Sequence, residues 1–125
     1  MIKEGVLILA HGSRREAGNE EVKNITKQIK AKDGLNRLYQ AAFMEFGQPN
    51  MVDGVAKLID SGVQKVIVVP LFLFSGNHIW RDIPQALEQQ RQQYPNVQFV
   101  LARHIAAANL FPDLVAELID GVDNK

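Results

Sequence analysis

The chain has 125 residues, of which 46% are hydrophobic and 22% charged, and its formal net charge is zero. This length and composition predict one compact domain over residues 1–125, and the balanced charge argues against a general nucleic-acid-coating protein. The sequence contains no cysteine, which excludes disulfides, thiolate zinc sites and cysteine nucleophiles. Its first apolar run is too short for a membrane span, so we expect a cytoplasmic protein without a membrane partner.

Short apolar runs alternate with longer amphipathic segments along the chain. Residues 5–10 (GVLILA) are a continuous apolar run that is typical of a buried strand. The spacing from Ser13 to Glu16 is that of a capping box, which predicts that a helix starts there. The apolar face of this helix is expected to consist of Val22, Ile25 and Ile29. After an Asp-Gly turn, residues 35–43 are expected to hold the second strand.

The middle of the chain repeats this pattern. A second helix is predicted after Pro49–Asn50, and Gly62 stands where a left-handed C-cap residue is expected. The inner face of that helix is expected to consist of Val52, Val55, Ala56 and Ile59. Residues 66–74 (VIVVPLFLF) are the most apolar run. Because proline removes a donor from a strand ladder, the strand is expected to end near Pro70, with residues 71–74 as an apolar exit.

The last third of the chain predicts a helix, a strand and a helix. A second capping box over residues 82–85, with Pro84 in the first turn, predicts a helix that runs to about Tyr94. Residues 97–101 are expected to form the fourth strand. A final helix carries an apolar face made of Leu110, Leu114, Leu118 and Ile119.

Apolar strands that alternate with helices indicate the fold class. The pattern predicts an α/β fold in which one four-stranded parallel sheet has helices on both faces, a flavodoxin-related sandwich. In such sheets, ligands bind outside the carboxyl ends of the strands, near the point where the strand order reverses. The common order 2-1-3-4 would make the first and third strands neighbours, so residues that follow them would face one crevice.

Three side chains with suitable chemistry fall at this edge. His11 follows the first strand, Glu45 the second and His78 the third. Two imidazoles and a carboxylate are suitable ligands for a divalent metal and accept protons near neutral pH. Each residue also has a simpler interpretation: a histidine after a strand is often a loop residue bonded to nearby backbone, and Glu45 fits a solvent-facing position of a strand.

Neighbouring residues add polar groups to the same edge. Residues 12–13 and 75–77 would place backbone N–H groups at helix starts, where anionic groups are favoured, although turn formation alone also explains them. His104 follows the fourth strand and would cap the region or touch a substrate. The sequence contains neither GxGxxG nor GxxxxGK[ST], so it suggests no dinucleotide or nucleoside triphosphate, and no GxSxG elbow indicates a hydrolase.

The segments around these residues resemble a known family. Residues 7–14 (LILAHGSR), 42–49 (AFMEFGQP) and 68–78 (VVPLFLFSGNH), followed by 82–84 (DIP), are similar in sequence and order to the class II chelatases that act on sirohydrochlorin. The similarity is to the short form of the cobalt, iron or nickel enzymes. It weakens after the fourth strand, where residues 106–109 (AAAN) replace the Gly-Pro-His-Pro-like stretch of many relatives, and a histidine-rich insertion is missing.

The resemblance implies a chelatase-type fold and a lyase activity. Members insert a divalent metal, Co²⁺, Fe²⁺ or Ni²⁺, into sirohydrochlorin without ATP or an organic cofactor, within cobalamin, sirohaem or related tetrapyrrole biosynthesis. The metal is therefore a substrate. By resemblance, His11 and His78 would be metal ligands and proton acceptors, and Glu45 would assist metal binding or proton removal. The sequence does not select among the three metals.

A flat substrate with carboxylates around it implies an apolar slot with cationic or N–H donors at its rim. Residues 71–74 and Trp80 are candidates for the slot, and the candidate rim cations are Arg14, Arg15, Arg81 and Arg103. The substrate-binding set is expected to be Ser13, Arg14, Leu73, Phe74, Ser75, Gly76 and Asn77. Ordinary solvated surface and core packing are the alternatives for any one of these residues.

Assembly and alternative functions complete the expectations. Because longer relatives hold two such units in one chain, the resemblance implies a symmetric homodimer in which each subunit supplies one wall, with residues 71–74 as a candidate interface. The main alternative function is a non-catalytic tetrapyrrole or metal carrier that uses the same pocket. A plain scaffold of the flavodoxin or receiver type is disfavoured, because no acidic cluster follows the first strand.

Overall fold

A single parallel sheet forms the centre of the protein in the computed structural model. The structure describes residues 2–75 and 78–122, without the side chains of residues 78–80. Its strands are β1 (Glu4–Ala10), β2 (Leu38–Phe43), β3 (Lys65–Pro70) and β4 (Gln98–Leu101), in the spatial order β2-β1-β3-β4. The connecting elements are α1 (Glu16–Ala31), α2 (Met51–Asp60), α3 (His78–Gln93), the short 3₁₀ helix η1 (Ile105–Ala107) and α4 (Phe111–Val122). The predicted α/β fold, strand order and four parallel strands are confirmed.

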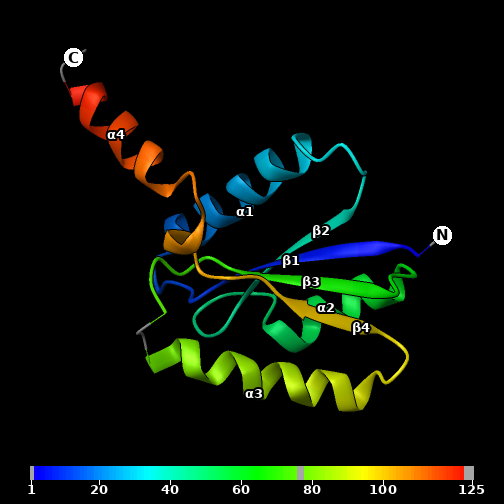
Figure 1. Cartoon of the computed structure of the whole chain (residues 1–125). Coiled ribbons are helices and arrows are strands. Elements are labelled where there is room, and N and C mark those ends of the chain that lie inside the picture. The colour runs from blue at the N-terminus through cyan, green and yellow to red at the C-terminus, as the bar shows by residue number, and fades with distance from the viewer. Residues whose placement is uncertain (1, 76–77, 123–125) are drawn as a thin grey trace.

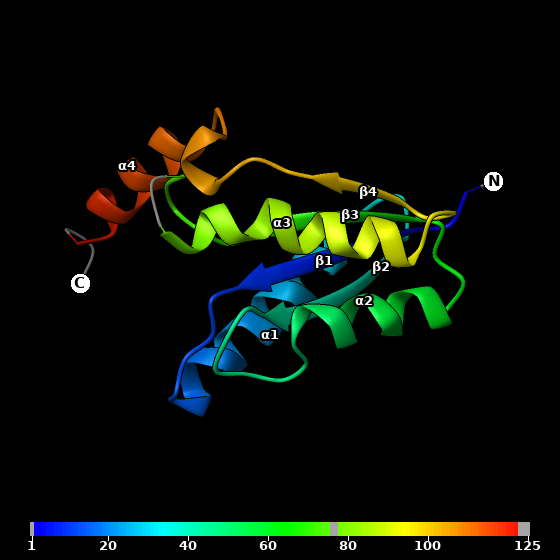
Figure 2. The same ribbon diagram turned by 90° about the horizontal axis from the view of Figure 1, so that it is seen from below.

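Helices cover the two faces of the sheet unequally. α1 lies on one face, and α2 and α3 lie on the other (Figures 1 and 2). Right-handed crossovers produce this arrangement. The chain moves from β1 to β2 toward one edge of the sheet and then from β2 to β3 and β4 toward the other edge, so the later helices lie on the opposite face. The main core fills the space between the sheet and the α2–α3 layer and contains Leu7, Leu9, Val55, Val66, Val68, Ile83 and Leu87. No helix in the described part of the chain is long and apolar enough to cross a membrane.

The predicted start of the first helix is wrong. α1 begins at Glu16 rather than at Ser13, and Arg15 occupies the N-cap position without a capping side-chain bond. The Ser13 hydroxyl instead accepts a hydrogen bond from the Arg15 N–H at 3.0 Å, which closes a tight turn before the helix. The local signal at Ser13 is therefore used by the loop that leaves β1.

The predicted start of the third helix is also wrong. α3 begins at His78, four residues before Asp82, and Pro84 lies inside it. Proline lacks an N–H and normally disfavours a helix interior. Ile83 is fully buried and Leu87 is 1% exposed, so packing against the sheet outweighs the local sequence signal.

One strand boundary and the inner face of one helix also differ from the expectation. The second strand begins at Leu38, because Leu35 is 70% exposed and Asn36 adopts a left-handed conformation with φ of 57°. In α2, Val52 is exposed, and the inner face is instead formed by Met51, Gly54, Val55 and Leu58. Gly54 explains why this side of α2 faces the sheet: the helix approaches so closely that a Cβ at position 54 would lie 2.9 Å from the Cβ of Ala42.

Several finer predictions are confirmed. β3 ends at Pro70, and Gly62 has the left-handed φ of 92° expected after a helix. The apolar segment that follows β3, residues 71–74, lies partly in the core and partly at the surface: Phe72 belongs to the buried core, and Phe74 is exposed. One prediction for α1 is wrong: Ile25, which was expected on the apolar face of this helix, is exposed, whereas Asn19 and Thr26 are buried.

Candidate active site

The loops that follow β1 and β2 run side by side at the carboxyl edge of the sheet. The hydrogen-bond ladder between these strands continues past their ends, with Met44 N–H donating to the Ala10 carbonyl and Glu45 N–H donating to the His11 carbonyl, both at 2.9 Å. This backbone pairing brings the two predicted site residues together. His11 Nε2 lies 3.0 Å from Glu45 Oε2, and the side chains are 40% and 52% exposed, so the pair is open to a ligand.

Gly12 allows the two loops to approach each other. Its φ of +99° lies in the region that favours glycine. A Cβ at this position would lie 2.6 Å from the Glu45 carbonyl oxygen and 3.0 Å from that of Phe46. The residue after His11 must therefore be glycine for the Glu45 loop to remain in place.

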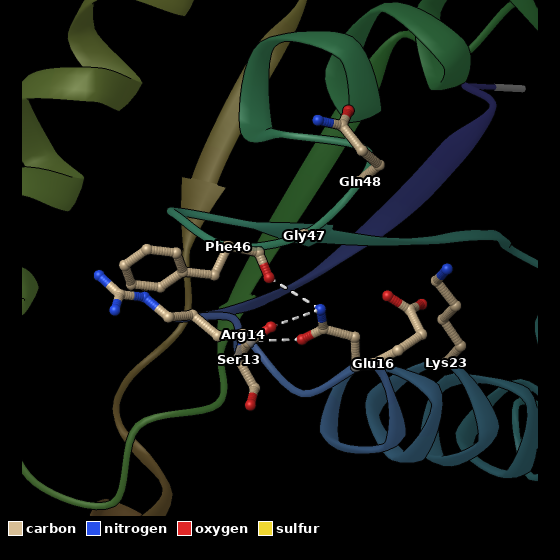
Figure 3. A pocket seen from close by; sticks show the side chains of 8 residues that line it. Ser13, Arg14, Glu16, Lys23, Phe46, Gly47 and Gln48 are labelled. Atoms are coloured by element: carbon tan, nitrogen blue, oxygen red, sulfur yellow. Dashed lines mark hydrogen bonds between the residues drawn. The ribbon is translucent and has the colours of Figure 1, made fainter.

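Asn19 holds both loops and was not singled out by the sequence. This α1 residue is 3% exposed. Its Oδ1 accepts a hydrogen bond from Ser13 N–H at 2.8 Å, and its Nδ2 donates to the Ser13 carbonyl at 2.9 Å and to the Phe46 carbonyl at 2.7 Å (Figure 3). One amide side chain thus links the loop carrying His11 to the loop carrying Glu45. An asparagine on a polar helix carries no sequence signal for this role.

An open hollow of about 340 Å³ lies beside the His11–Glu45 pair. Figure 3 shows that its wall comes from the start of α1 and the loop after β2. The residues that line it are Ser13, Arg14, Glu16, Asn19, Lys23, Phe46, Gly47 and Gln48. The Arg14 guanidinium carbon lies 4.6 Å from the centroid of the Phe46 ring, and His11 meets the same ring edge-on at 6.0 Å between centroids. The aromatic ring therefore orients a cation and an imidazole at one site.

Comparison with known proteins places the chain in a family. The family model described as CbiX matches residues 5–122. The chain belongs to the CbiX family. A sirohydrochlorin cobaltochelatase of Methanosarcina acetivorans is 32% identical over 120 residues, covering 90% of this chain and 92% of that protein. The chloroplastic sirohydrochlorin ferrochelatase of Arabidopsis thaliana is 29% identical over 116 residues, and this chain spans 51% of its length.

Solved structures agree with this assignment. A putative cobalamin biosynthesis CbiX protein from Marinobacter aquaeolei superposes with a TM-score of 0.77 and 26% identity, covering 97% of this chain and 95% of that one. The sirohydrochlorin chelatase SirB from Bacillus subtilis, in complex with cobalt, has a TM-score of 0.76 and 25% identity over 83% of this chain but only 44% of its own. The resemblance inferred from the motifs is confirmed, and this chain spans about half the length of several relatives.

The third predicted ligand of this CbiX-family protein is only partly described. His78 is the first residue of α3, which follows the exit of β3, but its side chain lies outside the description, as do Gly76 and Asn77. Among the side chains that are described, no three His, Asp or Glu residues form a group able to hold a metal ion. The structure therefore establishes the pairing of His11 with Glu45 and leaves the role of His78 as a prediction.

The other predicted residues follow the exit of β3. Leu73 and Phe74 are 48% and 60% exposed, and Ser75 is also exposed. Phe72 is buried, so its expected role in lining a slot is wrong. Backbone bonds from Ile105 to the Phe72 carbonyl and from Ala106 to the Leu73 carbonyl place the segment after His104 beside this exit.

A network of charged side chains occupies the opposite end of the sheet. Arg37 Nε donates to Glu4 at 2.7 Å and Nη1 donates to Asp33, whose carboxylate also accepts from the Tyr39 hydroxyl at 2.7 Å. The hydrogen bond from Arg37 lowers the pKa of Glu4, and the bond from Tyr39 contributes most to lowering the pKa of Asp33. Burial raises the pKa of Tyr39, and its bond to Asp33 adds to this. This network is remote from the candidate site and supports the fold.

Proposed function

We propose that this protein inserts a divalent metal into sirohydrochlorin as an ATP-independent lyase, with cobalt, iron or nickel as the metal and the cytoplasm as the compartment. The observation that carries the proposal is the 3.0 Å contact between His11 and Glu45 at the carboxyl edge of a CbiX-family sheet. Relatives named as sirohydrochlorin cobaltochelatases and ferrochelatases support the substrate and two of the metals.

The chemistry requires both a metal ligand and a proton acceptor. When the metal enters the macrocycle, two pyrrole nitrogens each lose a proton. In the neutral tautomer of His11 that carries its hydrogen on Nε2, this nitrogen donates to the Glu45 carboxylate and the lone pair of Nδ1 is available. That nitrogen can hold the metal or accept a pyrrole proton, and the second carboxylate oxygen of Glu45 can do the same. His78, at the start of α3, is the proposed third ligand and proton acceptor.

The surfaces around the pair suit a flat, polyanionic ring. Phe74 and Leu73 are exposed and apolar, as one wall of a slot requires. Arg14 stands over Phe46 and can pair with a substrate carboxylate. Ser13, Ser75, Gly76 and Asn77 complete the proposed binding set.

A homodimer is part of the proposal. The exposure of Leu73 and Phe74 supports an apolar contact with a second copy at this edge. The aligned region covers only 44% of SirB, so a second copy would supply the opposite wall of the slot.

Single-residue variants distinguish a chelatase from a carrier. His11→Ala and Glu45→Gln should lower the rate of Co²⁺ insertion by about 100-fold or more, the range expected when a proton acceptor is lost. Binding of sirohydrochlorin, followed by quenching of protein fluorescence, should change much less. His104→Ala, the same substitution near the same edge, should retain most of the insertion rate. Insertion that persists in the His11→Ala, His78→Ala double variant would show that the assigned roles are wrong, and tight binding without any rate enhancement by the unsubstituted protein would indicate a carrier.

A further inference from the structure

A hollow between α2 and α3 contains a buried polar side chain without a partner. Both helices lie on the same face of the sheet (Figures 1 and 2). The hollow has a volume of about 250 Å³, and its wall is formed by Met44, by the start of α2 and by the middle of α3. It shares no described residue with the hollow beside the His11–Glu45 pair, so it is a separate candidate site.

Gln90 is the unusual residue of this wall. It is 4% exposed and lies on the same side of α3 as the core residues Ile83 and Leu87. Its Oε1 atom has no hydrogen-bond partner, and no other buried side-chain atom in the described part of the chain lacks one. A buried acceptor without a partner lowers stability, and native proteins rarely retain one. Gln90 therefore indicates that the hollow receives a group with an N–H or O–H donor.

The rest of the wall limits the chemistry of this group. Every described side chain that lines the hollow is uncharged. A charged ligand would therefore lose its hydration without gaining an opposite charge. Met44 and Met51 contribute two thioether groups, which make favourable contacts with aromatic rings. An uncharged aromatic molecule with one donor group matches this wall.

The size of the hollow corresponds to one or two fused rings. A volume of about 250 Å³ equals that of about eight water molecules in the liquid, at about 30 Å³ each. This space is too small for a tetrapyrrole macrocycle. The small side chain of Ala86 leaves room on α3, and Val52, which was expected on the inner face of α2, is 52% exposed at the hollow. A small molecule can therefore enter from the solvent.

The hollow also contacts the loop of the candidate active site. Met44 lies directly before Glu45, and its N–H donates to the Ala10 carbonyl at 2.9 Å. The next bond along this ladder joins Glu45 to His11. An occupant that contacts Met44 would therefore lie one residue away from the proposed catalytic carboxylate.

We propose that this hollow binds a small, uncharged heteroaromatic molecule whose ring N–H donates a hydrogen bond to Gln90 Oε1. This ligand is additional to the metal and the tetrapyrrole of the proposed function. The proposal does not depend on metal insertion, because its test measures only binding and stability.

Indole and indene form a matched pair of probes, because they have nearly the same shape and only indole has a ring N–H. Each would be titrated into protein with labelled methionine methyl groups and followed by nuclear magnetic resonance. The Met44 and Met51 signals should shift with indole and reach saturation. Indene should bind at least about tenfold more weakly, because it leaves Gln90 Oε1 without a donor.

Gln90→Met provides the second measurement, since it removes the acceptor and keeps a side chain of similar length. Indole should bind at least about tenfold more weakly to this variant, and the melting temperature without ligand should rise by about 4 °C, because the unpartnered acceptor is gone. The matched control is Gln92→Met, the same substitution at an exposed position of α3, which should change neither quantity.

Three results would overturn the proposal. The first is the absence of saturable shifts with indole up to its solubility. The second is equal binding of indole and indene by the unsubstituted protein, a comparison that needs no variant. The third is a lower melting temperature of Gln90→Met, which would show that ordered water already satisfies Gln90 Oε1.

Discussion

Replacement of Asn19 by alanine tests how the fold positions the site. Asn19 is 3% exposed and makes three hydrogen bonds, of 2.8, 2.9 and 2.7 Å, to backbone groups of Ser13 and Phe46. The variant removes all three bonds and leaves these backbone groups without the side chain that satisfied them. Because these groups belong to the loops that carry His11 and Glu45, the substitution should affect both stability and activity.

The expected loss of stability follows from the number of bonds. Each buried hydrogen bond contributes about 1 kcal/mol net, so the three together predict a loss of about 3 kcal/mol in the free energy of unfolding. For a domain of this size, about 4 °C per kcal/mol converts this loss into a decrease in melting temperature of about 12 °C. The m-value should not change, since the same surface is exposed on unfolding.

Urea denaturation followed by circular dichroism measures the loss of unfolding free energy in Asn19→Ala, and the insertion assay measures the effect of the substitution on the rate of metal insertion. The matched control is Thr26→Val, a buried position of the same helix whose hydroxyl donates to the Val22 carbonyl one turn earlier, at 2.8 Å. Valine has nearly the same shape as threonine, so the free energy of unfolding should change by less than about 1 kcal/mol. A loss for Asn19→Ala no larger than that of the control, with unchanged metal insertion, would refute the role assigned to Asn19.

Two further substitutions test the loop and the remote charge network. Gly12→Ala should destabilise the fold and lower the insertion rate, because the new Cβ would meet the Glu45 carbonyl at 2.6 Å, and a melting temperature equal to that of the unsubstituted protein would contradict this. Arg37→Met should destabilise the protein at pH 7. The pKa values of Glu4 and Asp33 are lowered in the folded state, from the ordinary values of 4.5 and 3.8. The difference in unfolding free energy between the variant and the unsubstituted protein should therefore shrink as the pH falls below these ordinary values and the carboxylates become protonated. A difference that is constant from pH 7 to pH 3 would show that the ion pairs do not contribute.

The sequence predicted the sheet well because its central strand β1 is buried on both faces. β1 is buried at every position after Glu4, so its apolar run left little ambiguity. Helix starts were predicted less well, since local capping signals compete with packing. The Ser13 hydroxyl serves a turn, and the burial of Ile83 and Leu87 extends α3 through Pro84.

The site was predictable in position but not in geometry. His11 and Glu45 follow adjacent parallel strands, so their shared edge followed from topology alone. Their 3.0 Å contact depends on the ladder beyond the strands and on Gly12, which no periodicity reveals. The amphipathic pattern of α4 likewise predicted a helix with an apolar face, but such a pattern does not show which surface that face will contact.

The central claim is that this protein accelerates metal insertion into sirohydrochlorin. The most direct test is anaerobic absorbance spectroscopy of sirohydrochlorin with Co²⁺, Fe²⁺ or Ni²⁺, with and without catalytic amounts of protein. We expect the spectrum to convert to that of the metal complex many times per protein molecule with at least one metal, and faster than in buffer alone. A rate equal to that in buffer with all three metals would contradict the account.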